Sequence, residues 1–327
     1  FYLRKNRRDN RLNAREIQAV EKSLKGQEVH FDEAFRLFIA DGERKALREF
    51  TLNYYRRECN DFRRYLVREG HSLDLNRVVR SDIDNYIEDM QRERGLKVTT
   101  INTKLRAIRT LFNFLANCKY IDENPMERYP LLKDRKANIQ TFSLSQLKQL
   151  LNAPDLRTFT GQRDYTYMLL LIETGLRLNE VAGILVEDVK LSEGQIFVRN
   201  TKNHLHRYVP ITTKMREQLK RYLTLRGTCE TDHLFVTIDE TAMTRGALQK
   251  IVAHYGRKAK IKGVRCSPHT LRHTFAKLSV MNGAGIFELQ KILGHSSMEM
   301  VRVYVNLFSS EVSDKHREFS PLNNLDL

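Results

Sequence analysis

The chain has 327 residues, 41% hydrophobic and 29% charged, which is typical of a globular protein. No apolar run approaches the ~18 residues of a membrane-spanning helix, so we expect no membrane partner. The formal net charge is +16, and such basic proteins often bind a polyanion. Residues 1–136 carry 30 basic and 22 acidic residues, and residues 137–327 carry 26 and 18. Both halves are therefore candidates for contact with a nucleic acid, although a generally basic surface would give the same counts.

The cysteines and the first residues indicate the compartment. Cys59, Cys118, Cys229 and Cys266 are scattered without CxxC spacing, which favours a reduced protein over a disulfide-stabilised one. Residues 1–15 are basic but no apolar core follows them, as it would in a signal peptide. We therefore expect a cytoplasmic protein.

Residues 1–27 are predicted to form a basic N-terminal arm. Residues 1–25 hold eight basic and three acidic residues, and few apolar residues share a helical face. We expect this arm to become ordered only in contact with a partner.

Residues 28–122 are predicted to form a helical DNA-binding domain. Apolar residues recur at helical spacing in four stretches, and no strand pattern is present. Ser81, with Asp84 three residues later, predicts the start of the third helix, and Thr99 or Thr100 that of the fourth. The apolar positions are Phe31, Phe35, Phe38; Leu52, Tyr55, Cys59, Phe62, Leu66; Ile83, Tyr86, Ile87, Met90; and Ile101, Leu105, Ile108, Phe112, Leu115.

The fourth helix carries Lys104, Arg106 and Arg109 on the side away from its apolar face. These three side chains are predicted DNA contacts, since phosphate neutralisation by Lys and Arg supplies much of the affinity for DNA. An ordinary solvated helix face explains each of them equally well.

Residues 123–141 are predicted to be a linker, because Asn124-Pro125 ends the helical region and no apolar period follows. Ser143 and Gln146 then form a capping box at the start of a second domain, residues 142–327. Two strands are predicted there, Gln195–Arg199 and Arg207–Ile211, joined by a polar turn. The predicted helices cover 165–173, 178–184, 214–225, 244–260, 269–282, 286–293 and 298–308. Arg245, in the 244–260 helix, is a further predicted DNA contact.

Two basic residues lie in turns of this second domain. Arg177, in the string TGLRLNE, lies between two predicted helices. Lys202 lies at the tip of the predicted hairpin. Taken alone, either could be an ordinary surface residue.

His269 and Arg272 lie three residues apart at the start of a predicted helix that Pro268 opens. A helix N-terminus adds free N–H groups and a positive dipole end, so this set predicts a phosphate site. A zinc site is the alternative, because Cys266, His269 and His273 have loosely zinc-like spacing. No fourth ligand lies near them in the sequence, so we expect no metal.

Gly294-His295 follows a predicted helix, and Tyr304 lies nine residues after His295. Tyr304 is flanked by Val301, Val303 and Val305, a setting in which a tyrosine is usually part of the core.

The order of these residues resembles the tyrosine recombinase (phage integrase) family. The matching strings are TGLRLNE, TKNHLHRYVPI, SPHTLRHTFA and LGHSSMEMVRVYVN. The resemblance covers about residues 28–320, including the helical domain. Asn179 departs from the family pattern, since many relatives carry Ser before the Glu, and we expect no effect on activity.

The resemblance implies a mainly α fold with a small antiparallel sheet, in which two domains form a C-shaped DNA clamp. It also implies phosphoryl transfer without metal, ATP or another cofactor. Arg177 and Arg272 would clamp the phosphate in bidentate fashion, and His295 would donate a third hydrogen bond. Tyr304 would attack phosphorus with His269 as base, and Lys202 would protonate the 5′-oxygen. The product would be a 3′-phosphotyrosine, which conserves the energy needed for rejoining.

The resemblance further implies the partners. Four protomers would synapse two specific sites on double-stranded DNA, with accessory DNA-bending or directionality factors. The protein would be bacterial or phage-encoded and nucleoid-associated, and would integrate or excise a mobile element. Two alternatives stay open: a catalytically silent DNA-binding regulator on the same fold, and a type IB topoisomerase.

Overall fold

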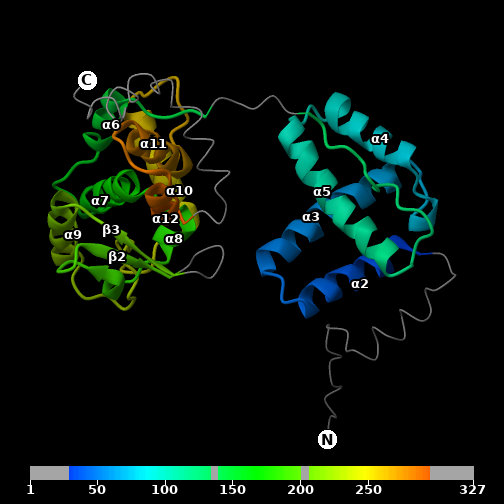
Figure 1. Cartoon of the computed structure of the whole chain (residues 1–327), viewed down its shortest axis with the longest axis horizontal. Helices are drawn as coiled ribbons and strands as arrows, with labels where there is room; N and C mark the ends of the chain where they lie inside the picture. Colours follow the sequence, from blue (N-terminus) through cyan, green and yellow to red (C-terminus); the bar gives the residue numbers. More distant parts are fainter. Residues whose placement is uncertain (1–28, 134–138, 200–205, 295–327) are drawn as a thin grey trace, which may run out of the picture. The chain divides into compact units, whose positions relative to one another are not determined.

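The computed structural model describes residues 29–133, 139–199 and 206–294. The chain divides into two compact units, Phe1–Ala137 and Asn138–Leu327, each of which is considered by itself (Figure 1). Their regular structure is mainly helical, with one small antiparallel sheet, as predicted. Within these stretches, no helix has both the length and the apolar composition that crossing a membrane would require.

The first unit contains four α-helices among its described residues. They are α2 (Phe31–Arg44), α3 (Glu49–Arg68), α4 (Arg80–Glu88) and α5 (Val98–Asn117). A 3-10 turn, η1 (Leu75–Arg77), precedes α4, and a π-helical turn, η2 (Asp89–Glu93), follows it. The four stretches of helical periodicity therefore each form a helix, as predicted.

The start of α4 differs from the prediction. Ser81 lies inside the helix, and Val79 occupies the N-cap position. The Asp82 carboxylate accepts a hydrogen bond from the Val79 backbone N–H at 3.0 Å. Asp84, the predicted partner of Ser81, instead accepts a hydrogen bond from the Tyr129 hydroxyl. Val79 has no side-chain acceptor, so α4 begins with only one of the two hydrogen bonds of a capping box, from the Val79 amide to Asp82.

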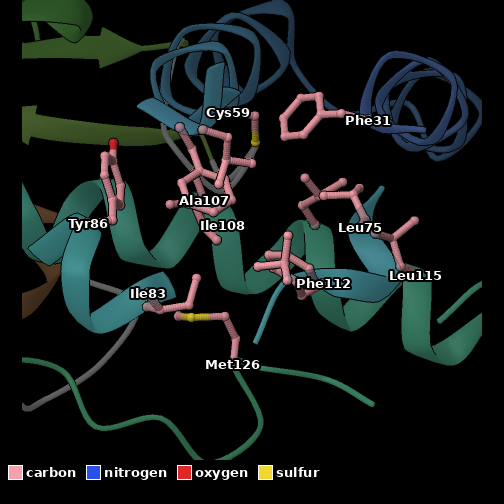
Figure 2. Packing of buried hydrophobic residues seen from close by; sticks show 14 of the residues in the cluster. Phe31, Cys59, Leu75, Ile83, Tyr86, Ala107, Ile108, Phe112, Leu115 and Met126 are labelled. Atoms are coloured by element: carbon pink, nitrogen blue, oxygen red, sulfur yellow. The ribbon is translucent and has the colours of Figure 1, made fainter. Parts of the chain in front are cut away.

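The core of the first unit joins all four helices. Phe31 of α2, Cys59 of α3 and Phe112 of α5 are fully buried in it, and Figure 2 shows them near one another. Met126, from the segment predicted as a linker, is also buried in this core and lies beside Ile83 in Figure 2. The first residues after α5 thus pack onto the helical unit, since their apolar side chains are shielded from water there.

The second unit contains the remaining described elements. The helices are α6 (Leu144–Leu151), α7 (Phe159–Thr174), α8 (Leu178–Ala182), α9 (Thr213–Arg226), α10 (Arg245–Lys258), α11 (Pro268–Met281) and α12 (Ile286–Leu293), and η3 (Val186–Asp188) is a 3-10 turn. The Ser143–Gln146 capping box is confirmed, with reciprocal hydrogen bonds of 3.2 and 2.9 Å. The helix predicted over Met298–Phe308 lies outside the described residues.

The sheet has the antiparallel order β1 (Val189–Lys190), β2 (Gln195–Val198), β3 (Arg207–Pro210). Gln195 pairs with Pro210, and Val198 with Arg207. Both predicted strands are confirmed, whereas the two-residue strand β1 is too short to show a sequence period. Since the pairing of β2 and β3 ends at Val198 and Arg207, Lys202 falls in the stretch that connects them.

Helix α7 is central to the second unit, because it packs against both α9 and α11 (Figure 1). Its Tyr167, Met168 and Leu171 are fully buried in the larger core of this unit. The packing of α7 against α11 has a functional consequence. It brings the turn after α7, which carries Arg177, close to the helix that carries His269 and Arg272.

Candidate active site

The turn between α7 and α8 fixes the position of Arg177. Gly175 ends α7 with a φ of +60°, and a Cβ there would lie 2.3 Å from Phe275 Cδ1. Both the backbone and the close approach of α11 therefore require glycine. Arg177 follows as the N-cap residue of α8, with 30% of its side chain exposed.

Arg272 reaches the same turn from the first part of α11. Ser267 caps this helix by accepting a hydrogen bond from Thr270 N at 3.2 Å, and Pro268 occupies its first turn. Arg272 is only 3% exposed. Its Nη1 donates to the Gly175 carbonyl oxygen at 2.6 Å and its Nη2 to that of Leu293 at 2.9 Å. These carbonyl groups hold the guanidinium in one orientation without neutralising its charge.

The two arginines meet at the C-terminal end of α12. Arg177 Nη1 donates to the carbonyl oxygens of Leu293 and Gly294, each at 3.2 Å, and Arg272 shares the Leu293 oxygen. Gly294 caps α12 in the left-handed conformation with a φ of +61°. A helix C-terminus is the negative end of the dipole, which favours guanidinium groups there. Arg177 and Arg272 therefore lie side by side at the end of α12. The last residue they contact there, Gly294, directly precedes His295 in the sequence.

His269 belongs to the same cluster. The residue is solvent-exposed in part, yet protein atoms crowd the imidazole, and this desolvation lowers its pKa below the ordinary value of 6.5. The positive charges of Arg272 and Arg177 lower it further. His273, one turn along α11, has its ring centroid 4.5 Å from that of His269. Burial and the nearby His269 and Arg272 lower the pKa of His273 to about 4. Both imidazoles are therefore mostly neutral at pH 7.

Two residues that hold Arg177 in place, directly or through each other, were not singled out from the sequence. Glu180 is 2% exposed and accepts hydrogen bonds from the backbone N–H and Nη1 of Arg177, at 2.9 and 3.1 Å. Arg207, the first residue of β3, donates to both carboxylate oxygens of Glu180, at 3.0 and 2.9 Å. Glu180 could have been identified from the sequence, because a Glu three residues after an N-cap residue forms a capping-box pattern. Nothing in the local sequence separated Arg207 from other strand residues.

Three predicted catalytic residues, Lys202, His295 and Tyr304, lie outside the described residues. Their roles stay predictions. The described part of the site brings together three of the six predicted residues, namely Arg177, His269 and Arg272. They lie near the end of α12.

The predicted DNA contacts separate into two groups. Lys104 is wrongly predicted as part of an exposed basic face, because it is 8% exposed and its Nζ contacts Glu58 and Asp61. Helix α3 packs against this side of α5, so two carboxylates cover the ammonium group. Arg109 is half-buried and donates to the Tyr129 carbonyl oxygen. Arg106 and Arg245 are exposed and so remain candidates for contact with DNA.

The zinc alternative gains no support from the described geometry. In residues 29–133, 139–199 and 206–294, no three His, Cys, Asp or Glu side chains gather in a way that could hold a metal ion. The Cys266 thiol contacts the Val264 carbonyl oxygen at 3.8 Å, and its Sγ lies 2.3 Å from where a Cβ at Gly256 would be. Cys266 is thus part of the packing between α10 and the start of α11.

Known proteins share this sequence and fold. The model of the phage integrase family matches residues 140–311, and that of the phage integrase N-terminal SAM-like domain matches residues 42–119. A tyrosine recombinase of Pseudothermotoga lettingae is 31% identical over 83% of this chain and 92% of its own. Tyrosine recombinase XerC of Thermodesulfovibrio yellowstonii is 30% identical over 84% of this chain and 92% of its own.

Solved structures agree on the fold. The Tn1549 transposon integrase bound to a circular intermediate DNA superimposes with a TM-score of 0.71 at 20% identity, covering 87% of this chain and 99% of that one. The XerH site-specific recombinase bound to its difH substrate superimposes with a TM-score of 0.69 at 18% identity, covering 91% of this chain and 92% of that one. The family matches, the relatives and the fold agree: the chain belongs to the phage integrase family and is a tyrosine recombinase, an enzyme of site-specific DNA recombination.

Proposed function

We propose that this enzyme cuts and rejoins DNA through a 3′-phosphotyrosine formed on Tyr304. The observation that carries the proposal is the meeting of Arg177 and Arg272 at the Leu293 carbonyl oxygen, with His269 beside them. Phosphoryl transfer needs positive groups fixed in advance around the phosphate oxygens, because charge develops there in the transition state.

The two arginines would clamp the scissile phosphate. Arg177 keeps 30% of its side chain exposed, so a phosphate can reach it. Arg272 is held by two backbone carbonyl groups, which leave its charge intact. A guanidinium presents its N–H groups in a planar fork that matches two phosphate oxygens, and a lysine cannot reproduce this geometry.

His269 would take the proton of the Tyr304 hydroxyl as its oxygen attacks phosphorus. A neutral imidazole is required for this, and the lowered pKa of His269 provides one at pH 7. The bond from phosphorus to the 5′-oxygen then breaks, and Lys202 would protonate that oxygen. His295 would donate to the phosphate. Rejoining reverses these steps when a 5′-hydroxyl attacks the phosphotyrosine, so no energy source is consumed.

The partner we propose is double-stranded DNA carrying specific recombination sites, synapsed by four protomers. Exposed Arg106 and Arg245 would contact the phosphate backbone. Support for the assembly comes from a lambda integrase tetramer bound to a Holliday junction, which has a TM-score of 0.68 at 15% identity. We further propose that the reaction integrates or excises a mobile element, with accessory factors setting its direction.

The test is covalent trapping. The bound sequence is first selected from a pool of random duplexes, and a nicked version then serves as a suicide substrate from which the cut strand is lost. The wild-type chain should yield a protein–DNA adduct on a denaturing gel, in excess EDTA as well as without it. Tyr304→Phe should bind the duplex normally and yield no adduct. Binding without any adduct from the wild-type chain would indicate a silent DNA-binding regulator instead. Relaxation of supercoiled plasmids lacking the site would indicate a topoisomerase.

A further inference from the structure

Arg207 forms a buried ion pair that belongs to the candidate active site. Its side chain is 11% exposed and that of Glu180 1% exposed. Arg207 donates through Nη1 and Nη2 to both oxygens of Glu180, at 3.0 and 2.9 Å, and through Nε to the Ile292 carbonyl oxygen at 2.9 Å. One guanidinium therefore connects strand β3, helix α8 and the C-terminal end of α12.

Glu180 is shared between Arg207 and Arg177. Its Oε1 accepts from Nη1 of both arginines, at 3.0 and 3.1 Å, and its Oε2 accepts from the Arg177 backbone N–H at 2.9 Å. Burial opposes ionisation of Glu180, but the hydrogen bonds and charges of Arg207 and Arg177 outweigh it and hold its pKa below the ordinary value. The carboxylate is thus charged, and two cations surround it.

The charge balance shows what Arg207 contributes. With Arg207 present, two guanidiniums share one carboxylate, so these three described side chains together carry a net positive charge. Without it, Glu180 and Arg177 would form a neutral pair, and a buried carboxylate that has lost one partner would draw the remaining guanidinium toward itself. Arg177 would then be both less available to an incoming phosphate and displaced from it.

A second effect acts through α12. A Cβ at Gly294 would lie 2.7 Å from Arg207 Nη1, so the glycine cap and the guanidinium are in close contact. Arg207 also holds the carbonyl of Ile292, one residue before the Leu293 oxygen on which Arg177 and Arg272 meet. Loss of Arg207 would loosen the part of α12 that orients Arg177.

We propose that Arg207 is a positioning residue for the cleavage reaction. It balances the negative charge of Glu180 and fixes the end of α12, so that the charge and orientation of Arg177 remain available to the scissile phosphate. The inference rests on the proposed function, because it assigns Arg207 a role in the same phosphate site.

Arg199 provides a matched control on the same hairpin. It directly follows β2, whereas Arg207 is the first residue of β3. It also pairs with a buried carboxylate, with its Nε 2.6 Å from Asp188 Oδ1 and its Nη2 2.7 Å from Glu187 Oε1. Asp188 has a side-chain exposure of 1%, like Glu180. These Arg199 contacts lead into η3 and not to Arg177 or α12, so Arg199→Gln measures the cost of breaking such a pair away from the site.

The experiment measures single-turnover cleavage of the selected duplex by the full chain, with wild type, Arg207→Gln, Arg207→Lys and Arg199→Gln. Arg207→Gln should slow cleavage roughly 10–100-fold, the scale for losing a group that orients a functional side chain. DNA affinity should stay within about threefold, since Arg207 is buried. Arg207→Lys, which keeps the charge, should recover part of the rate. Arg199→Gln should cleave within about threefold of wild type, because its contacts lead away from the chemistry.

A second substrate separates positioning from folding. A methylphosphonate at the scissile position removes the negative charge of the phosphate, so Arg177 is needed less. On it, the defects of Arg177→Ala and Arg207→Gln should shrink together, and the double variant should be no slower than Arg177→Ala alone. The inference is overturned if Arg207→Gln matches Arg199→Gln, if its defect is equal on both substrates, or if neither Arg207 variant folds. Failure of the wild-type chain to form an adduct at Tyr304 would instead overturn the proposed function.

Discussion

Each unit of this recombinase buries cations, but it surrounds them differently. In the first unit, Lys104 Nζ lies 2.8 Å from Glu58 Oε2 and 2.9 Å from Asp61 Oδ2, so one ammonium faces two carboxylates. In the second unit, Arg177 and Arg207 share the single carboxylate of Glu180. Arg272 is held there by the carbonyl oxygens of Gly175 and Leu293.

The difference separates a structural cation from one kept for a ligand. The carboxylates of Glu58 and Asp61 balance the charge of Lys104 and connect α5 to α3. This ammonium group therefore does not need an anionic ligand. Carbonyl groups and a shared carboxylate orient Arg177 and Arg272. Donors that are fixed in advance in this way favour a phosphate, because they need no reorganisation when charge develops on its oxygens.

Lys202 should give the largest effect on the cleavage rate. In contrast to Lys104, which is structural, we predict that Lys202 takes part in the chemistry. Loss of a general acid slows proton transfer roughly 10²–10⁴-fold, so Lys202→Ala should be slow on ordinary DNA. Replacing the scissile 5′-oxygen with sulfur removes the need for a proton, because a thiolate leaves readily. Lys202→Ala should then cleave much faster, whereas His269→Ala should show no comparable rescue. Equal impairment of Lys202→Ala on both substrates would assign the acid to another residue.

Arg177→Lys and Arg272→Lys keep the positive charge of the site but remove the planar fork. Each should reduce the cleavage rate roughly 10²–10³-fold, the scale for losing one preorganised donor. Single-turnover rates on the selected duplex give the comparison, with binding measured in parallel. Rates within a few-fold of wild type would show that these arginines only hold α12 in place.

Lys104→Met should affect folding instead of chemistry. Removing one partner of a buried ion pair leaves its carboxylates uncompensated, which should cost about 3–5 kcal/mol of unfolding free energy. Urea unfolding of the full chain measures this, with the exposed Lys97→Met as the control. The rate of cleavage per folded molecule should stay within a few-fold of wild type. A large rate defect in a stably folded Lys104→Met protein would contradict the division between the two units.

The smallest expected effect is a shift in the pH dependence of the cleavage rate, which His269 should set. Its pKa is lowered by desolvation and by Arg272 and Arg177, so the neutral base persists as the pH falls to 6.5. The cleavage rate should therefore decline with a midpoint below pH 6.5. Arg265 also lowers this pKa, so Arg265→Gln should move the midpoint upward. A wild-type midpoint above 6.5 would show that His269 is not the group that titrates.

The sequence was most informative where a local pattern sets the structure. Helical periodicity placed α2 to α5, and the Ser143–Gln146 capping box is formed as predicted. The burial of Lys104 could not be read locally, because it depends on Glu58 and Asp61 of another helix. The same holds for Arg207, whose partners Glu180 and Ile292 lie 27 and 85 residues away in the chain. Long-range charge pairing is a tertiary property, so local pattern identifies such residues poorly.

The central claim is that the DNA strand becomes attached to Tyr304, and peptide mapping of the trapped adduct tests it most directly. Trypsin cleaves after Arg302 and Lys315, and Tyr304 is the only tyrosine between them. After nuclease digestion, mass spectrometry should find the residual nucleotide on this peptide and on the tyrosine itself. A nucleotide on any other peptide, or on one of the serines within this peptide, would contradict the account.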